Sequence, residues 1–115
     1  MDRIVKAFFN SAAGLAHGFR HELALRQEGV VLLIALPVSV FVTDNWWKRL
    51  ALIGVLLFVI AVELLNTAIE ALCDHVTPQD HPHIRIVKDL GSAAVFASLT
   101  LAGLTWLVAL AERLV

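Results

Sequence analysis

The chain has 115 residues and a net charge of −1, which leaves room for one domain and argues against nucleic-acid binding. Hydrophobic residues make up 59% of it and charged residues 17%, whereas soluble domains average about 45–50% and about 25%. The excess of apolar side chains predicts a membrane protein, and the single cysteine, Cys73, excludes an internal disulfide.

An amphipathic helix is expected at the start of the chain, over about residues 2–25. Its apolar residues recur at a roughly helical spacing, and basic and polar residues occupy much of the rest. Such a helix can lie in the membrane surface with its apolar side down. The alternative is that it packs only against the other helices.

Three apolar runs follow, at residues 30–42, 50–69 and 90–111. A membrane-crossing helix needs about 20 residues, which the second and third runs provide. The first run is short, so its helix must begin near Leu23 or end early, near Pro37.

The expected fold is an all-α integral membrane protein with three transmembrane helices and an N-terminal amphipathic surface helix. Thr43-Asp44-Asn45 is a polar turn, and the prolines and histidines around residues 75–83 indicate an exposed loop. The expected segments are spans at about 26–43, 49–73 and 89–112 and a cytoplasmic loop at 74–88.

The positive charges predict how the chain is oriented in the membrane. Six Lys and Arg residues share the side of the N-terminal segment and the 74–88 loop, and three lie on the other side. We therefore expect a cytoplasmic N-terminus and a periplasmic or external C-terminus. The two sets are Arg3, Lys6, Arg20, Arg26, Arg85 and Lys88, against Lys48, Arg49 and Arg113.

Glu63 lies inside the second apolar run, where a carboxylate costs roughly 2.5–3.5 kcal/mol on insertion scales. Asn66 and Glu70 follow on the same helix face, because a helix turns by 100° per residue. Glu70 is then near the lipid–water interface and Glu63 about 10 Å deeper. The alternative is a structural polar seam between helices. Two acids on one face repel each other unless a cation or proton intervenes, so the pattern favours a functional site.

Further polar side chains border the first and third spans on the same side of the membrane. Taken alone, Glu22 and Glu28 are explained as the solvated face of a surface helix, and Lys88 and Asp89 as an anchor at the membrane interface. With the acidic face they suit phosphoryl transfer, because carboxylates hold Mg²⁺, a lysine steadies phosphate charge and a carboxylate can act as general base. These residues are Glu22, Arg26, Gln27, Glu28, Lys88 and Asp89, with Gly91 and Ser92 allowing close approach of backbones.

At these residues the sequence resembles a known family. Glu63-Leu-Leu-Asn66-Thr-Ala-Ile-Glu70-Ala resembles the E-x-L-N-[ST]-A-I-E signature of the prokaryotic diacylglycerol kinases. The resemblance runs over nearly the whole chain. It extends to Arg26-Gln27-Glu28-Gly29, to Lys88-Asp89-Leu-Gly91-Ser92-Ala93-Ala94, and to Arg3 and Lys6 in the opening helix.

The resemblance implies an ATP-dependent lipid kinase of the bacterial inner membrane that converts diacylglycerol to phosphatidic acid, working as a homotrimer with shared active sites. Glu63 would be the general base, supported by Asn66. Glu22 and Glu70 would hold Mg²⁺ beside the ATP phosphates. Further ATP contacts are implied for Arg3, His81, Lys88 and Asp89, and contacts with the lipid head for Arg26, Gln27, Glu28, Glu63 and Ser92.

Other interpretations stay open at this point. Gram-positive relatives with the same signature are undecaprenol kinases, so the acceptor lipid is not fixed by the motif. A small transporter also uses an intramembrane glutamate, although such carriers usually have four spans. A structural subunit would tolerate neutral residues at positions 63 and 70. The stretch Ile84-Arg85-Ile86 departs from the Ser-Gly-Arg common in the family, and no nucleotide contact is assigned to it.

Overall fold

The computed structural model describes residues 2–77 and 79–115 and has four helices over that part of the chain. They are α1 (Asp2–His21), α2 (Leu23–Val42), α3 (Trp46–Val76) and α4 (Pro82–Leu114). The last three are long and apolar enough to cross a membrane, whereas α1 is amphipathic. The expected all-α membrane fold is confirmed, and the first span takes the early start near Leu23.

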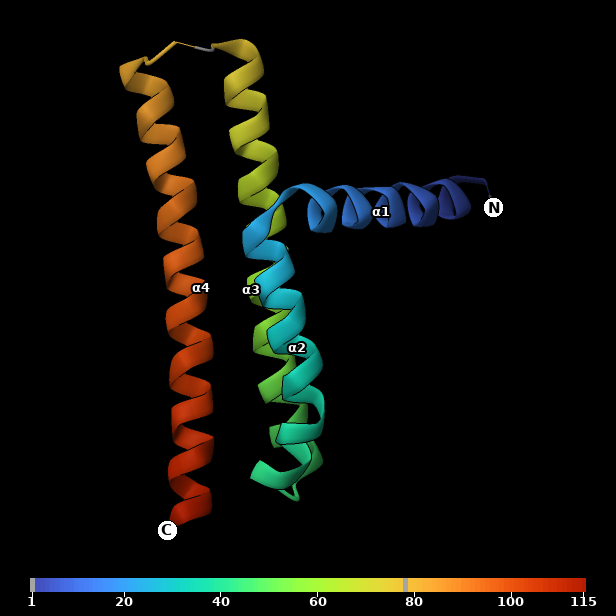
Figure 1. Ribbon diagram of the computed structural model, residues 1–115, viewed down its shortest axis with the longest axis vertical. Coiled ribbons are helices and arrows are strands. Elements are labelled where there is room, and N and C mark those ends of the chain that lie inside the picture. Colours follow the sequence, from blue (N-terminus) through green and yellow to red (C-terminus); the bar gives the residue numbers. More distant parts are fainter. Residues whose placement is uncertain (1, 78) are drawn as a thin grey trace.

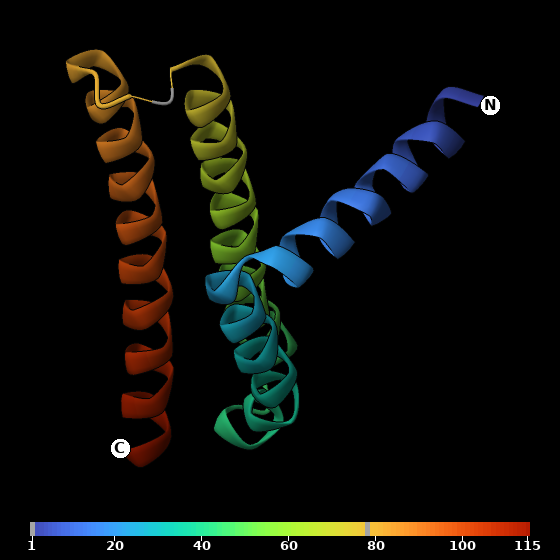
Figure 2. The ribbon, with the colours of Figure 1, turned by 45° about the horizontal axis from the view of Figure 1, so that its top comes forward.

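The helices α3 and α4 run antiparallel and side by side and form the long axis of the molecule (Figure 1). The helix α2 packs on the half of α3 that follows the 43–45 turn, and it contacts α4 little. The helix α1 leaves this bundle sideways at the start of α2 (Figures 1 and 2). The end of α3 and the start of α4 therefore extend past the level of α1.

A tight corner joins α1 to α2 at Glu22, whose extended backbone (φ −115°, ψ 119°) separates the two helices. Arg26 closes the corner, because its Nη1 donates to the carbonyl oxygens of Phe19 (3.3 Å) and Arg20 (2.8 Å) at the end of α1. A glycine at position 29 lets the Phe19 ring approach α2 closely. These contacts fix the direction in which α1 leaves the bundle.

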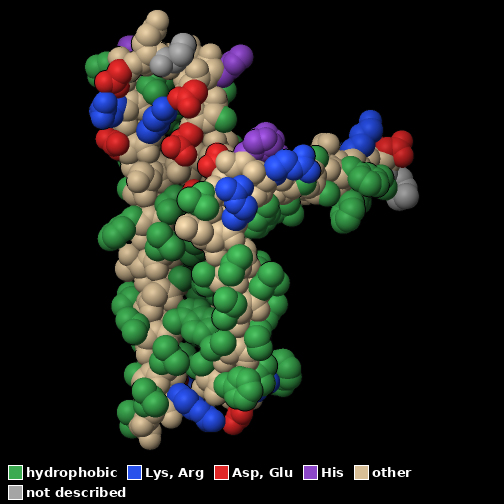
Figure 3. Space-filling view, viewed as in Figure 1, with side chains coloured by type: hydrophobic (Ala, Val, Ile, Leu, Met, Phe, Trp, Pro, Cys, Tyr) green, Lys and Arg blue, Asp and Glu red, His purple; other side chains and the backbone are tan. Residues whose placement is uncertain are grey.

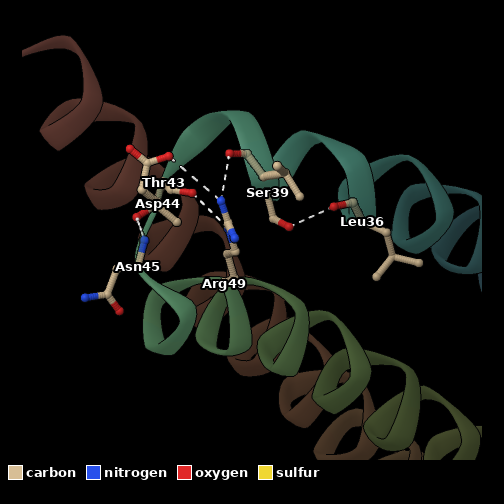
Figure 4. A network of polar contacts seen from close by, with 7 residues as sticks. Leu36, Ser39, Thr43, Asp44, Asn45 and Arg49 are labelled. Carbon is tan, nitrogen blue, oxygen red and sulfur yellow. Dashed lines mark hydrogen bonds and ion pairs between the residues drawn. The ribbon is translucent and has the colours of Figure 1, made fainter.

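A second arginine closes the turn between α2 and α3 (Figure 4). The Nε of Arg49 donates to the carbonyl oxygen of Thr43 (2.9 Å), and its Nη2 donates to that of Val40 (3.3 Å). The guanidinium carbon lies 4.6 Å from the centre of the Trp46 ring, which adds a cation–π contact. Arg26 thus satisfies carbonyls at the end of α1, and Arg49 satisfies carbonyls at the end of α2.

Both long helices continue beyond the thickness of a membrane. The helix α3 has 31 residues and α4 has 33, whereas about 20 suffice to cross. The Nδ1 of His81 accepts from the backbone N–H of His83 (3.1 Å) and caps α4, with Pro82 in its first turn. Because α3 ends at Val76 and α4 begins at Pro82, most of the segment expected as a cytoplasmic loop is helical.

The packed centre of the bundle is small. Val42, Leu52 and Ala109 form a buried cluster, against which Trp106 packs. The indole Nε1 of Trp106 also donates to the backbone carbonyl oxygen of Leu52 (3.1 Å) and so ties α4 to α3. This bond satisfies an N–H that neither lipid nor an apolar core could satisfy.

Apolar side chains cover much of the outer surface, including Leu33 (69% exposed) and Phe96 (72%). Charged side chains gather along α1 and over the adjoining ends of α3 and α4, with a smaller group at the opposite end of the bundle (Figure 3). An apolar band between two charged ends is what a membrane protein presents to lipid or to another subunit.

Candidate active site

The acidic face of α3 lies where α3 passes the corner between α1 and α2. Leu64 packs there against Gly18 of α1, and the neighbouring Glu63 is buried, with 9% of its surface exposed. Asn66 is half-buried, and its Nδ2 donates to Oε1 of Glu70 (3.4 Å). The row expected from the sequence is therefore present along one side of the helix.

Four carboxylates from three segments act on one another at this place. Glu63 is repelled by Glu70 and Glu22, and Glu28 of α2 is repelled by Glu63. Crowding of this kind is costly unless a cation or a proton is shared. An all-oxygen set of donors is what Mg²⁺ prefers.

A metal ion at this site would need ligands besides the protein. Among the described residues, no group of three or more His, Cys, Asp and Glu side chains is placed to hold one. Mg²⁺ is commonly held by one or two carboxylates, with water and substrate phosphates completing its octahedron. The carboxylates of α3 and of the corner therefore fit a magnesium ion that arrives with a phosphate ligand.

Asn66 also connects α3 to α4. Its Oδ1 lies so close to Gly91 that a Cβ there would overlap it. The same oxygen is buried without a hydrogen-bond partner among the described residues, as are Oε1 of Glu28 and Oγ1 of Thr67. Buried polar atoms in folded proteins are normally paired, so each of these three oxygens has capacity for a donor supplied by a ligand or another subunit.

Two ion pairs stand beyond the acidic face, toward the end of α3 and the start of α4. The Nζ of Lys88 lies 2.6 Å from Oδ1 of Asp74 and is also attracted by Glu70. Arg85 pairs with Asp80 at 2.9 Å. A cavity of about 330 Å³ opens between these groups, and it is lined by Thr77, Gln79, Asp80, Ile84, Arg85, Lys88 and Asp89.

Some of the residues expected in the site lie elsewhere within one subunit. Arg26 is engaged with the end of α1, and Gln27 and Ser92 are exposed. Arg3 belongs to the first turn of α1, and that end of the helix points away from α3 and α4 (Figure 1). His81 stands at the start of α4, where it acts as the cap.

Two polar residues of this region escaped the sequence analysis. Asp74 follows Glu70 by four residues, so it extends the acidic face by one more turn; that spacing could have revealed it. Thr67 falls between Glu63 and Ala71 on the side that faces α1, where it helps to line a groove. Nothing in its local sequence distinguishes it from an ordinary helical threonine.

The chain is similar to known proteins over most of its length. The family model of the prokaryotic diacylglycerol kinases matches residues 9–110. A diacylglycerol kinase of Pseudomonas aeruginosa is 40% identical over 106 residues, which cover 92% of this chain and 86% of the relative. Diacylglycerol kinases of Escherichia coli (38% identity over 94% of this chain and 88% of the relative) and Haemophilus influenzae (34%, over 84% and 81%) are also similar.

The match covers all four helices apart from the chain ends, and it includes the acidic face of α3 and the polar start of α4. The protein belongs to the prokaryotic diacylglycerol kinase family.

Proposed function

We propose that this protein is a membrane-bound lipid kinase that transfers the γ-phosphate of ATP to the hydroxyl of diacylglycerol and forms phosphatidic acid and ADP. The single observation that carries the proposal is the buried Glu63 beside Asn66 and Glu70, on a chain similar over most of its length to proteins named diacylglycerol kinase. A membrane lipid and a soluble nucleotide can meet only at the lipid–water boundary, and this acidic face runs along the axis that crosses it.

In the proposed reaction the lipid hydroxyl oxygen attacks the γ-phosphorus in line. A new oxygen–phosphorus bond forms as the bond to the β,γ-bridging oxygen breaks, and ADP leaves. Glu63 accepts the hydroxyl proton, and a base in contact with the attacking oxygen contributes typically about 10²–10⁴-fold to the rate. Asn66 holds Glu70 in place through their hydrogen bond.

Glu22 and Glu70 are proposed to hold Mg²⁺ together with the nucleotide phosphates, and Lys88 and Asp89 to bind the nucleotide. The ion, when bound, offsets negative charge on the phosphates. The repulsion among Glu22, Glu63 and Glu70 supports this assignment, because a cation relieves it. The unpaired Oε1 of Glu28 supports a role for α2 at the lipid head.

We further propose that the enzyme is a homotrimer of the bacterial inner membrane, with its N-terminus in the cytoplasm. Two observations support an oligomer: the extensive exposed apolar surface and the direction of α1, whose first turn contains Arg3 and points away from α3 of its own chain (Figure 1). If Arg3 and Glu63 serve one site, they come from different subunits. Mixing inactive Arg3→Ala and Glu63→Gln subunits before assembly should then restore part of the activity, whereas sites built within one subunit would stay inactive.

The function is tested by transfer of radiolabelled γ-phosphate to defined lipids in mixed micelles. We expect labelled phosphatidic acid from diacylglycerol, and none when Mg²⁺ is removed with EDTA. Undecaprenol serves as the competing acceptor, and preferential labelling of undecaprenol would overturn the assignment of diacylglycerol. An absence of labelled lipid from either acceptor would overturn the kinase assignment itself.

A further inference from the structure

Lys88, proposed above to bind the nucleotide, forms an ion pair that joins the two long helices next to the acidic face, and its partner Asp74 has no role in the sequence motif or the proposed chemistry. Oδ1 of Asp74, near the end of α3, lies 2.6 Å from Nζ of Lys88 on α4. We propose that Asp74 is a positioning residue, which holds the Lys88 ammonium in the direction from which the nucleotide phosphates approach. This inference rests on the proposed kinase function.

The ammonium of Lys88 needs a partner to hold it in one position. A lysine has a flexible four-carbon stem and binds as a point charge, so its position is set by what holds the ammonium. A charge-assisted bond as short as that to Asp74 fixes one of its three N–H donors and leaves two for another acceptor. Glu70, the proposed metal ligand, also attracts the Lys88 ammonium electrostatically.

The ion pair between Lys88 and Asp74 adds little to the stability of the fold. The side chains of Lys88 and Asp74 are 37% and 65% exposed, and exposed ion pairs contribute little to folding. The location of the pair suggests a role in binding instead, because Lys88 and Asp89 both line the cavity between the ends of α3 and α4.

The opposite end of the same two helices supplies a matched control. Lys48 of α3 and Glu112 of α4 form an ion pair of 2.8 Å, with side chains 47% and 56% exposed. It resembles the Lys88–Asp74 pair in helices, length and exposure, but it lies at the far end of the bundle from Glu63 and Glu70. A purely structural role in holding α3 to α4 would be shared by both pairs, whereas a role in nucleotide binding would belong to one.

The test uses full-length protein in mixed micelles and compares Asp74→Asn, Asp74→Glu and Glu112→Gln. Asp74→Asn should raise the KM for ATP about five-fold, the upper range for an exposed pair, with the lipid KM and the thermal unfolding midpoint unchanged. Asp74→Glu, which keeps the charge, should return the KM toward that of the wild type. Glu112→Gln should match the wild type in every kinetic constant.

A double-mutant cycle separates action through Lys88 from an independent effect. In a Lys88→Met background, adding Asp74→Asn should cause no further rise in the KM for ATP. The inference is overturned if Asp74→Asn leaves that KM unchanged, if its effect persists in full without Lys88, or if Glu112→Gln has the same effect. Loss of phosphate transfer in the wild type would instead overturn the proposed function, so the two failures are distinguishable.

Discussion

Glu63 is an unusual residue to find at its position. It is buried on a helix whose neighbouring positions are almost all apolar, and other carboxylates act on it. Ionisable side chains inside membrane segments are costly and are kept for function. Its neighbour Asn66 has an unpaired oxygen pressed against Gly91, so the backbone of α4 helps to fix the polar side of α3.

Replacing the carboxylate of Glu63 by an amide tests its role as a base. Glu63→Gln keeps the size of the side chain but cannot accept the hydroxyl proton, so we expect turnover to fall by about 10²–10⁴-fold. Nucleotide binding, measured directly with a non-hydrolysable ATP analogue, should stay near that of the wild type. Turnover within a few-fold of the wild type would contradict the base assignment.

Adding one methyl group to Gly91 tests the contact between α3 and α4. Gly91→Ala must push the Asn66 amide away, because a Cβ would overlap Oδ1. The clash is with the end of a side chain that can rotate, so the cost is at the low end for overpacking, about 1 kcal/mol. We expect a lower unfolding midpoint and reduced turnover. Gly103→Ala on the same helix is the control, since a Cβ there has no atom within 4 Å. Equal behaviour of the two variants would argue against the contact.

Among the helices, α1 depends on the fewest contacts for its direction. Its C-terminal carbonyls are held by one guanidinium, that of Arg26, and Phe19 packs against Gly29. The resemblance to the family had implied that Arg26 contacts the lipid head. Its engagement with α1 gives it a structural task in each subunit, which can be measured separately.

Arg26→Ala should loosen α1 without unfolding the bundle. Removing both hydrogen bonds costs about 1 kcal/mol or somewhat more for a charged donor, so amide hydrogen exchange near the end of α1 should become faster while exchange in α3 stays slow. Arg20→Ala removes a positive charge from the same corner but leaves its backbone carbonyl in place, and it serves as the control. Unchanged exchange in Arg26→Ala would contradict the role of this side chain at the corner.

The apolar runs were enough to predict three spanning helices and an amphipathic opening helix, because lipid demands long uninterrupted helices. The corner at Glu22 was harder to place, since no proline or glycine marks it and it depends on Arg26 reaching back to α1. The helical ends of α3 and α4 were also missed. The prolines and histidines around residues 75–83 resemble a loop in composition, but α3 continues to Val76 and the cap at His81 starts α4.

The same limit applies to the candidate site. Glu63, Asn66 and Glu70 share a helix, so their spacing alone places them on one face. The approach of Gly91 to Asn66 and of Asp74 to Lys88 joins two helices, and such contacts depend on how the helices pack, which no local pattern contains.

Taken as a whole, the molecule has two charged ends separated by an apolar band (Figure 3). Glu63, the buried acid among the described residues, lies on the α3 segment that leads to the end with Asp74 and Lys88. If Glu63 and Glu70 serve the reaction, the nucleotide must bind at the end where α3 meets α4, near Asp74 and Lys88. Substituting Mn²⁺ for Mg²⁺ shows at which end the nucleotide binds, because the paramagnetic ion broadens the NMR signals of nearby amides. The opposite end, with Arg49 and Glu112, provides an internal reference.

The most direct measurement is therefore paramagnetic broadening of backbone amide signals by Mn²⁺ bound to a non-hydrolysable ATP analogue, in micelles. We predict strong broadening for residues 63–74 and 85–92, and none for residues 43–49 or 106–113. Broadening confined to the end with Lys48 and Glu112, or an acidic face left unaffected at saturating nucleotide, would contradict the proposal that MgATP binds beside Glu63 and Glu70.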